Sequence, residues 1–173
     1  MKVLTILAAL VAMWLLAGCG EPTAAPVDTV AAPEQAIAPE APLPPVLPVV
    51  DVAAAQALLT PDETVEGVDF DVAGSTTMTG AVVGYKSTAY AVPVLAGQTL
   101  TVTLEPKDNT NLYINVLDVA NATGEAVHQG DMAGPKASFM AANDGVYLVR
   151  PYQFRAVARR GTESAYSILV ERK

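Results

Sequence analysis

Cysteine and histidine are nearly absent from this chain of 173 residues, which contains one of each. A single cysteine cannot form an intramolecular disulfide, and one Cys with one His cannot build a zinc site of the usual kind. A nucleophile activated by a histidine would have to use His128 alone. No other acid–base pair is marked in the sequence. We therefore expect a protein that is not an enzyme and that holds no metal or other cofactor.

Basic residues are also scarce, since 10 Lys and Arg stand against 18 Asp and Glu, for a net charge of −8. Nucleic acid is not expected as a partner, because phosphate contacts need clustered positive charge. Only one long apolar run is present, at residues 3–18, and no second run approaches the roughly 20 residues that span a bilayer. The lack of a second long apolar run excludes a polytopic membrane protein.

The remaining composition divides the chain into three parts. Residues 21–61 contain nine of the 13 prolines and no glycine, whereas residues 62–173 contain all six tyrosines and all three phenylalanines. We predict a leader at 1–18, a Pro/Ala-rich tether at 19–61 and one domain at 62–173. The tether has five acidic residues and no Lys or Arg. We expect a spacer, with a proline-rich ligand for another protein as the alternative.

The leader has the three regions of a secretory signal: a positive Lys2, an apolar stretch from Val3 to Leu16, and small residues. The segment Leu16-Ala17-Gly18-Cys19 resembles the bacterial lipoprotein signal, in which the cysteine is lipidated and becomes the mature N-terminus. This resemblance implies a membrane anchor at Cys19. It also implies the outer membrane, facing the periplasm, because Gly20 stands where the inner-membrane retention signal has Asp. The alternative is an uncleaved signal anchor.

Apolar residues alternate with polar ones from residue 65 onward, which is typical of half-buried strands. The segments 90–94, 100–104, 112–116 and 166–170 each place three apolar side chains on one face. Turn residues separate these segments. We predict an all-β domain, an antiparallel β-sandwich or flattened barrel of about eight strands. Pro151 should lie at an edge or a bulge. Asp51 should cap a short helix over 52–59.

One segment, 152–162, breaks the alternation and contains Arg155, Arg159 and Arg160. In a helical turn the Cβ atoms of Arg155 and Arg159 would lie about 5–6 Å apart on one face. In an extended segment they would still share a face, at about 13 Å. Gly161 would end the turn. Paired guanidinium groups in an otherwise acidic domain suit a carboxylate-lined cleft on a partner, because arginine binds carboxylates in a bidentate manner.

Residues 80–172 resemble the periplasmic inhibitors of goose-type (g-type) lysozyme. The matching residues occur in the same order along the chain: Gly80, Gly84-Tyr85, Tyr90, Ala96-Gly97-Gln98, Gly145, Tyr147, Arg150, Arg155, Ala158-Arg159 and Tyr166. The resemblance implies that Tyr85, Arg155 and Arg159 enter the substrate cleft of the lysozyme and meet its acidic residues. Arg160 is a further candidate contact. Between the arginines, Ala156 and Val157 replace the polar residues of the family.

The sequence therefore favours a lipid-anchored envelope protein that inhibits g-type lysozyme. The alternative is a structural or carbohydrate-binding envelope lipoprotein that shares only the sandwich. Tyr90, Tyr147 and Tyr166 lie at core spacing on predicted strands, so we expect them to pack rather than to bind a ligand.

Overall fold

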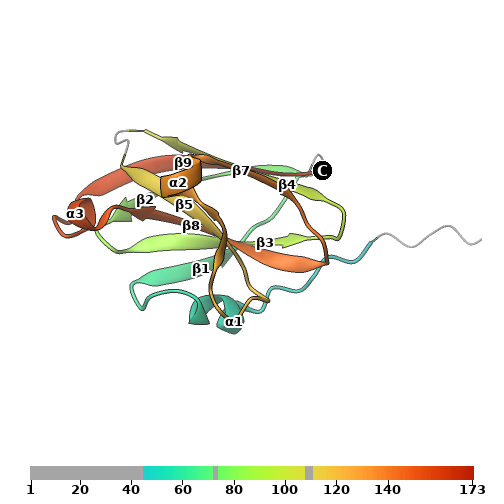
Figure 1. The fold of residues 1–173 in the computed structure, drawn as a ribbon. Coiled ribbons are helices and arrows are strands. Elements are labelled where there is room, and N and C mark those ends of the chain that lie inside the picture. The colour runs from blue at the N-terminus through green and yellow to red at the C-terminus, as the bar shows by residue number, and fades with distance from the viewer. Residues whose placement is uncertain (1–44, 72–73, 108–110) are drawn as a thin grey trace, which may run out of the picture. The chain divides into compact units, whose positions relative to one another are not determined.

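Two β-sheets pack face to face and bury the core between them (Figure 1). The computed structural model describes residues 45–173 except 72–73 and 108–110, so the predicted leader, Cys19 and the tether up to residue 44 lie outside the described residues. One sheet has the strand order β1-β3-β8-β5-β6 and the other has the order β2-β9-β4-β7. The predicted β-sandwich is confirmed, and the sheets are not joined into a closed barrel.

The described residues form nine strands and three short helices. The five-stranded sheet contains β1 (Glu63–Gly67), β3 (Ser87–Val94), β8 (Gly145–Gln153), β5 (Leu112–Asp118) and β6 (Ala126–Gln129). The four-stranded sheet contains β2 (Ser75–Val83), β9 (Glu163–Arg172), β4 (Thr99–Pro106) and β7 (Lys136–Met140). The helices are α1 (Val52–Ala57), α2 (Gly130–Ala133) and α3 (Arg155–Ala158).

Neighbouring strands run antiparallel, as predicted, except that β1 runs parallel to β3. The chain crosses from β1 to β2 in the opposite sheet and returns through a tight turn to β3. This detour through the second sheet supplies the crossover that a parallel pair requires. The alternation in the sequence indicated the strands but not this pairing.

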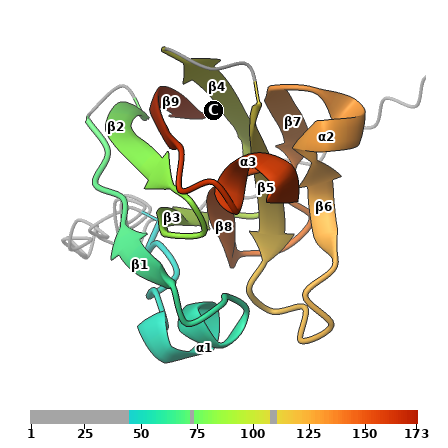
Figure 2. The same ribbon diagram turned by 90° about the vertical axis from the view of Figure 1, so that its left-hand side faces the viewer.

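The predicted alternation is observed in β4, where Leu100, Val102 and Leu104 are buried and the residues between them are not fully buried. β3 differs, because both of its faces are covered. Tyr90, Val92 and Val94 face the core between the sheets, while Ala89 and Ala91 belong to a second apolar cluster. The prediction of a half-buried strand at 90–94 is therefore wrong, because α1 covers the outer face of this sheet (Figure 2).

The predicted helix is present as α1, and it is shorter than the range 52–59. Asp51 caps it by accepting a hydrogen bond from the backbone N–H of Ala54 at 3.0 Å. Ala55 is completely buried in the second cluster, and Leu58 and Leu59 pack against it. The compact unit that contains the described residues begins at Leu43. α1 therefore packs on the sheet, although it precedes residue 62, where the composition places the start of the domain.

Gly80 is a position where the core leaves no room for a side chain. The hydroxyl oxygens of Tyr90 and Tyr166 are 3.0 Å apart in the core, and a Cβ atom on Gly80 would lie 2.6 Å from the Tyr166 oxygen. Burial, together with the hydrogen bond to Tyr90, raises the pKa of Tyr166. Tyr90, Tyr147 and Tyr166 are all buried, which confirms that they pack.

We expect Gly80→Ala to lower the free energy of unfolding by about 1–3 kcal/mol, because the added methyl group must displace the Tyr166 ring. Urea denaturation measures the change. Gly67→Ala is the matched control, since a Cβ atom there has no other atom within 4 Å. Equal unfolding midpoints for the two variants would show that the Tyr90 and Tyr166 rings can move to make room for the methyl group at little cost in free energy.

Candidate functional site

Two connections that are far apart in the sequence meet at one end of the sandwich. The turn 84–86 joins β2 to β3, and α3 with residues 159–162 joins β8 to β9. Because β2 pairs with β9, with Val83 opposite Glu163, both connections leave the sheets at the same end. The backbone N–H of Gly84 donates to the carbonyl oxygen of Thr162 at 3.1 Å. The chain thus brings the Tyr85 turn against the segment that carries the arginines (Figure 2).

Gly84 allows this close approach. Its φ angle is +62°, a left-handed conformation that favours glycine. A Cβ atom on Gly84 would lie 3.1 Å from the carbonyl oxygen of Ala158 and 3.6 Å from the Cα atom of Gly161. The turn therefore rests directly on the end of α3. Tyr85 follows Gly84 and is 50% exposed, so its ring is available to a partner.

The arginine segment forms a helical turn, one of the two conformations expected for it. The N–H of Arg159 donates to the carbonyl oxygen of Arg155 at 3.0 Å, so the two side chains share a face. Val157 and Ala158 are buried and hold the turn to the sandwich. Gly161, with φ +65°, ends the turn as predicted, and its N–H donates to the Ala158 carbonyl oxygen at 2.9 Å.

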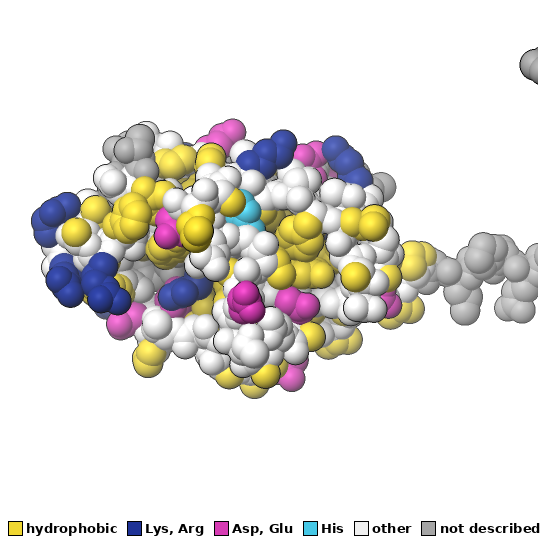
Figure 3. All heavy atoms as spheres, in the orientation of Figure 1, with side chains coloured by type: hydrophobic (Ala, Val, Ile, Leu, Met, Phe, Trp, Pro, Cys, Tyr) yellow, Lys and Arg dark blue, Asp and Glu magenta, His cyan; other side chains and the backbone are white. Residues whose placement is uncertain are grey.

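The three arginine side chains are exposed, and no ion pair within the described part of the chain includes any of them. Basic side chains accordingly gather at the end of the molecule where α3 lies (Figure 3). The chain as a whole has a net charge of −8, so this end is a local exception. A carboxylate of a partner that reaches this end meets guanidinium groups that form no ion pair with the described residues.

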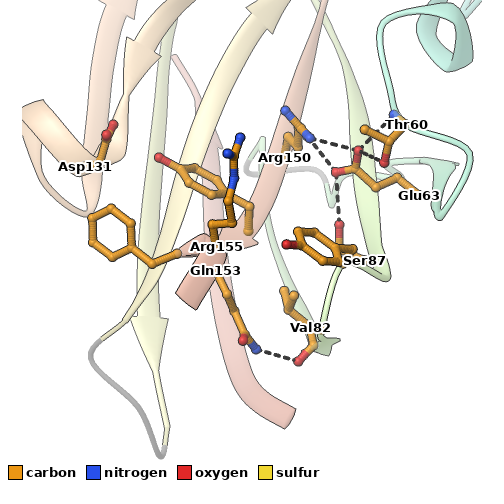
Figure 4. Close-up of a pocket in the computed structure, with 12 residues that line it drawn as sticks. Thr60, Glu63, Val82, Ser87, Asp131, Arg150, Gln153 and Arg155 are labelled. Atoms are coloured by element: carbon orange, nitrogen blue, oxygen red, sulfur yellow. Dashed lines mark hydrogen bonds and ion pairs between the residues drawn. The ribbon is translucent and has the colours of Figure 1, made fainter. Parts of the chain in front are cut away.

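Tyr85 and Arg155 line the same pocket, which has a volume of about 300 Å³ (Figure 4). Arg159 and Arg160 do not line this pocket and lie farther along the segment. The structure thus brings together two of the predicted binding residues around a hollow and places Arg159 one helical turn beyond it.

An ion pair between Glu63 and Arg150 forms one wall of the pocket (Figure 4). Arg150 is bidentate, with Nε 2.6 Å from one carboxylate oxygen and Nη2 2.9 Å from the other. The Glu63 side chain is only 2% exposed, and it also accepts hydrogen bonds from Thr60 and Ser87. Burial by itself would raise the pKa of Glu63, but the bonds from Arg150 and Thr60 hold that pKa below its ordinary value.

Aromatic side chains form another wall of the pocket, which Tyr152 and Phe154 line. Phe154 is 45% exposed and packs edge-on against Tyr113, with ring centroids 4.6 Å apart. Tyr152 lies beside Tyr113, with ring centroids 5.8 Å apart, and the Asp131 carboxylate also lines the pocket. Burial and this carboxylate raise the pKa of Tyr152 to about 12, so its hydroxyl stays protonated at neutral pH. The sequence reasoning gave no role to this aromatic wall.

The described residues contain no group of three or more Cys, His, Asp or Glu side chains that could hold a metal ion. His128 lies in β6, with Nε2 3.0 Å from the Gly134 carbonyl oxygen. Among the described helices, none has the length and apolar character needed to cross a membrane.

No protein-family model matches the chain, and no curated protein does. A solved structure resembles it in both sequence and fold: PliG of Aeromonas hydrophila, a periplasmic inhibitor of g-type lysozyme. The two are 32% identical, the match covers 64% of this chain and 97% of PliG, and the TM-score is 0.57. The chain belongs to the PliG family. PliG of Salmonella Typhimurium shares the fold, with 21% identity over 63% of this chain and 97% of that chain, at a TM-score of 0.50.

A mutant of the Escherichia coli PliG shares the fold as well, with 19% identity over 64% of this chain and 98% of that chain, at a TM-score of 0.50. The family resemblance that was based on scattered glycines, tyrosines and arginines is thus confirmed. Several of those residues have structural roles in this fold. Gly80, Tyr90 and Tyr166 pack together in the core, and Arg150 pairs with Glu63.

Proposed function

We propose that this protein inhibits g-type lysozyme in the periplasm of the bacterial envelope. The observation that carries the proposal is the placement of Tyr85 beside Arg155 at a basic end whose guanidinium groups are unpaired among the described residues. The PliG of Aeromonas hydrophila, which inhibits this class of lysozyme, is 32% identical to the chain. Fold and sequence similarity therefore support the same class of partner.

In the proposed mechanism, Tyr85, Arg155 and Arg159 enter the acidic substrate cleft of the lysozyme. Glycoside hydrolysis requires one carboxylic acid to protonate the leaving oxygen. A guanidinium group next to that acid favours its ionised form, which removes the proton donor. The Tyr85 ring adds contact area and one hydroxyl group in the same cleft. Arg160, next to Arg159, extends the positive charge toward the rim of the cleft.

An inhibition assay that compares several lysozyme classes tests this function. A soluble chain of residues 20–173, which includes every described residue, is added to c-type, g-type and i-type lysozymes during lysis of cell walls. We expect inhibition of the g-type enzyme alone. No effect on any class would contradict the proposal and favour a structural or carbohydrate-binding envelope protein that shares only the sandwich.

We further propose that a lipid on Cys19 anchors the protein to the outer membrane. The basis is the Leu16-Ala17-Gly18-Cys19 segment, which contains the only cysteine of the chain. Each buried CH₂ group of an acyl chain contributes about 0.8 kcal/mol, so several chains on one residue hold a protein firmly at a bilayer. Loss of Lys2 with the leader would take the net charge from −8 to −9.

Cys19→Ser should move the protein from the membrane fraction to the soluble periplasmic fraction, because the acyl chains would be lost. Cell fractionation and immunoblotting measure the distribution. Inhibition of g-type lysozyme in solution should not change, because Cys19 lies outside the folded unit that begins at Leu43. A Cys19→Ser protein that stays with the membranes after a salt wash would exclude the lipid anchor.

A further inference from the structure

Gln153 is a buried polar residue at the junction of the two candidate binding segments. It is the last residue of β8 and is 6% exposed. Its side-chain Nε2 donates to the carbonyl oxygen of Val82 at 2.8 Å and to that of Thr162 at 3.0 Å. Figure 4 shows Gln153 reaching toward Val82 at the base of the pocket. One side chain therefore contacts the segment before Tyr85 and the segment after the arginines.

These two hydrogen bonds join three parts of the fold. β8 belongs to the five-stranded sheet, whereas β2 and β9 belong to the four-stranded sheet. Val82 lies near the end of β2, and Thr162 immediately precedes β9. The Thr162 carbonyl oxygen also accepts the N–H of Gly84. Gln153 begins the loop 153–162, and its side chain binds the other end of that loop at Thr162. The same side chain binds Val82, just before the Tyr85 turn.

The local pairing of β8 explains why a side chain supplies these bonds. β3 pairs with β8 only as far as Val149, so beyond that point β8 has a single neighbour, β5. Pro151 is buried in this part of β8, which pairs with β5 alone, so the expected edge position is met only locally, within a central strand. A primary amide carries two N–H donors on one neutral group, which suits two carbonyl acceptors from different strands. A serine hydroxyl has one donor, and a carboxylate has none when ionised.

We propose that Gln153 is a positioning residue of the lysozyme-binding site. Its amide holds the Tyr85 turn and α3 in one arrangement, so that Tyr85, Arg155 and Arg159 meet the partner as a preformed unit. Without this link, only part of the free protein has the binding arrangement, and the apparent affinity falls in proportion to that fraction. This inference rests on the proposed inhibition of g-type lysozyme.

Gln153→Met tests the role, because methionine keeps the length of the side chain and removes both donors. In the soluble chain we expect the dissociation constant for g-type lysozyme to rise about tenfold, as for a protein with one tenth of its molecules in the competent state. Tyr90→Phe is the control. It also removes a buried hydrogen bond, at 3.0 Å to Tyr166, but it lies in the core between the sheets and should leave the affinity unchanged.

A double-mutant cycle separates positioning from a general loss of stability. In a background that carries Tyr85→Ala and Arg155→Ala, Gln153→Met should have a smaller further effect on affinity, because two of the three side chains that it positions are gone. The amide hydrogens of Gly84 and Gly161 should also exchange faster in Gln153→Met than in Tyr90→Phe. A tenfold loss that persists unchanged in the double background would overturn the inference.

Binding of the unmodified chain to g-type lysozyme tests the proposed function separately. If it does not bind g-type lysozyme, the proposed function and this inference both fail. If it binds and Gln153→Met binds equally well, the inference alone fails. Should Gln153→Met not fold, Gly84→Ala provides the second test, since its Cβ atom would push the turn away from Ala158. Full affinity of a folded Gly84→Ala would also overturn the inference.

Discussion

Replacing Arg155 or Arg159 with alanine should weaken binding to g-type lysozyme by about 2–4 kcal/mol each, the range for a charged residue buried at an interface. Both guanidinium groups lie on one face of α3, are exposed, and have no carboxylate partner among the described residues. We therefore expect both groups to be available to carboxylates of the lysozyme cleft. Isothermal titration calorimetry with the soluble chain measures the change.

Lys136→Ala is the matched control for the loss of one positive charge. Lys136 is exposed at the start of β7, and β7 lies at the opposite edge of the four-stranded sheet from β2. Its replacement should leave the affinity within experimental error. If Arg155→Ala and Lys136→Ala weaken binding equally, the effect comes from net charge, and the arginine pair is not the site.

Arg155→Lys distinguishes charge from geometry. Lysine keeps the charge, so the association rate and its fall with rising salt should stay near those of the unmodified protein. It loses the planar fork that binds a carboxylate through two parallel hydrogen bonds, so the dissociation rate should rise. Identical rates for both proteins would mean that the site requires only charge at this position.

The sequence indicated the features that depend on near neighbours. The helical turn at Arg155–Ala158 was one of two conformations expected from the spacing of Arg155 and Arg159, and Gly161 ends it as predicted. The cap at Asp51 and the alternation in β4 are equally local. In each case, the physical cause acts within a few residues, so a single sequence contains the necessary information.

Contacts between distant residues were not predictable in this way. Glu63 and Gln153 carry no local signal, because their partners are Arg150 in one case and Val82 and Thr162 in the other. The resemblance to the family included Arg150 without a role for it. Only the folding of β1 alongside β3 and of β8 alongside β5 brings these groups to one end of the sandwich. That these groups line one pocket with Tyr85 and Arg155 therefore becomes apparent only in three dimensions.

Arg150→Met should lower the free energy of unfolding by about 3 kcal/mol, because it leaves the Glu63 carboxylate buried without its positive partner. This value lies at the low end of the range for breaking a buried ion pair, since Arg150 is 27% exposed. Urea denaturation measures the loss. A variant that combines Glu63→Leu with Arg150→Met should regain most of the stability, because an apolar pair leaves no buried charge. A double variant no more stable than Arg150→Met would contradict this account.

The pH dependence of the same variant gives an independent check, and its sign follows from the lowered pKa of Glu63. A carboxyl group whose pKa is lower in the folded than in the unfolded state contributes stability above the unfolded pKa, and this contribution is lost as pH falls through the folded pKa. In Arg150→Met, burial is opposed only by the bonds from Thr60 and Ser87, so we expect the pKa of Glu63 to rise and the carboxyl to take up a proton in mild acid. The stability difference between the two proteins should therefore be largest near about pH 7 and shrink toward about pH 4. A difference that is constant over this interval would mean that the Glu63 carboxylate does not depend on Arg150 for its charge.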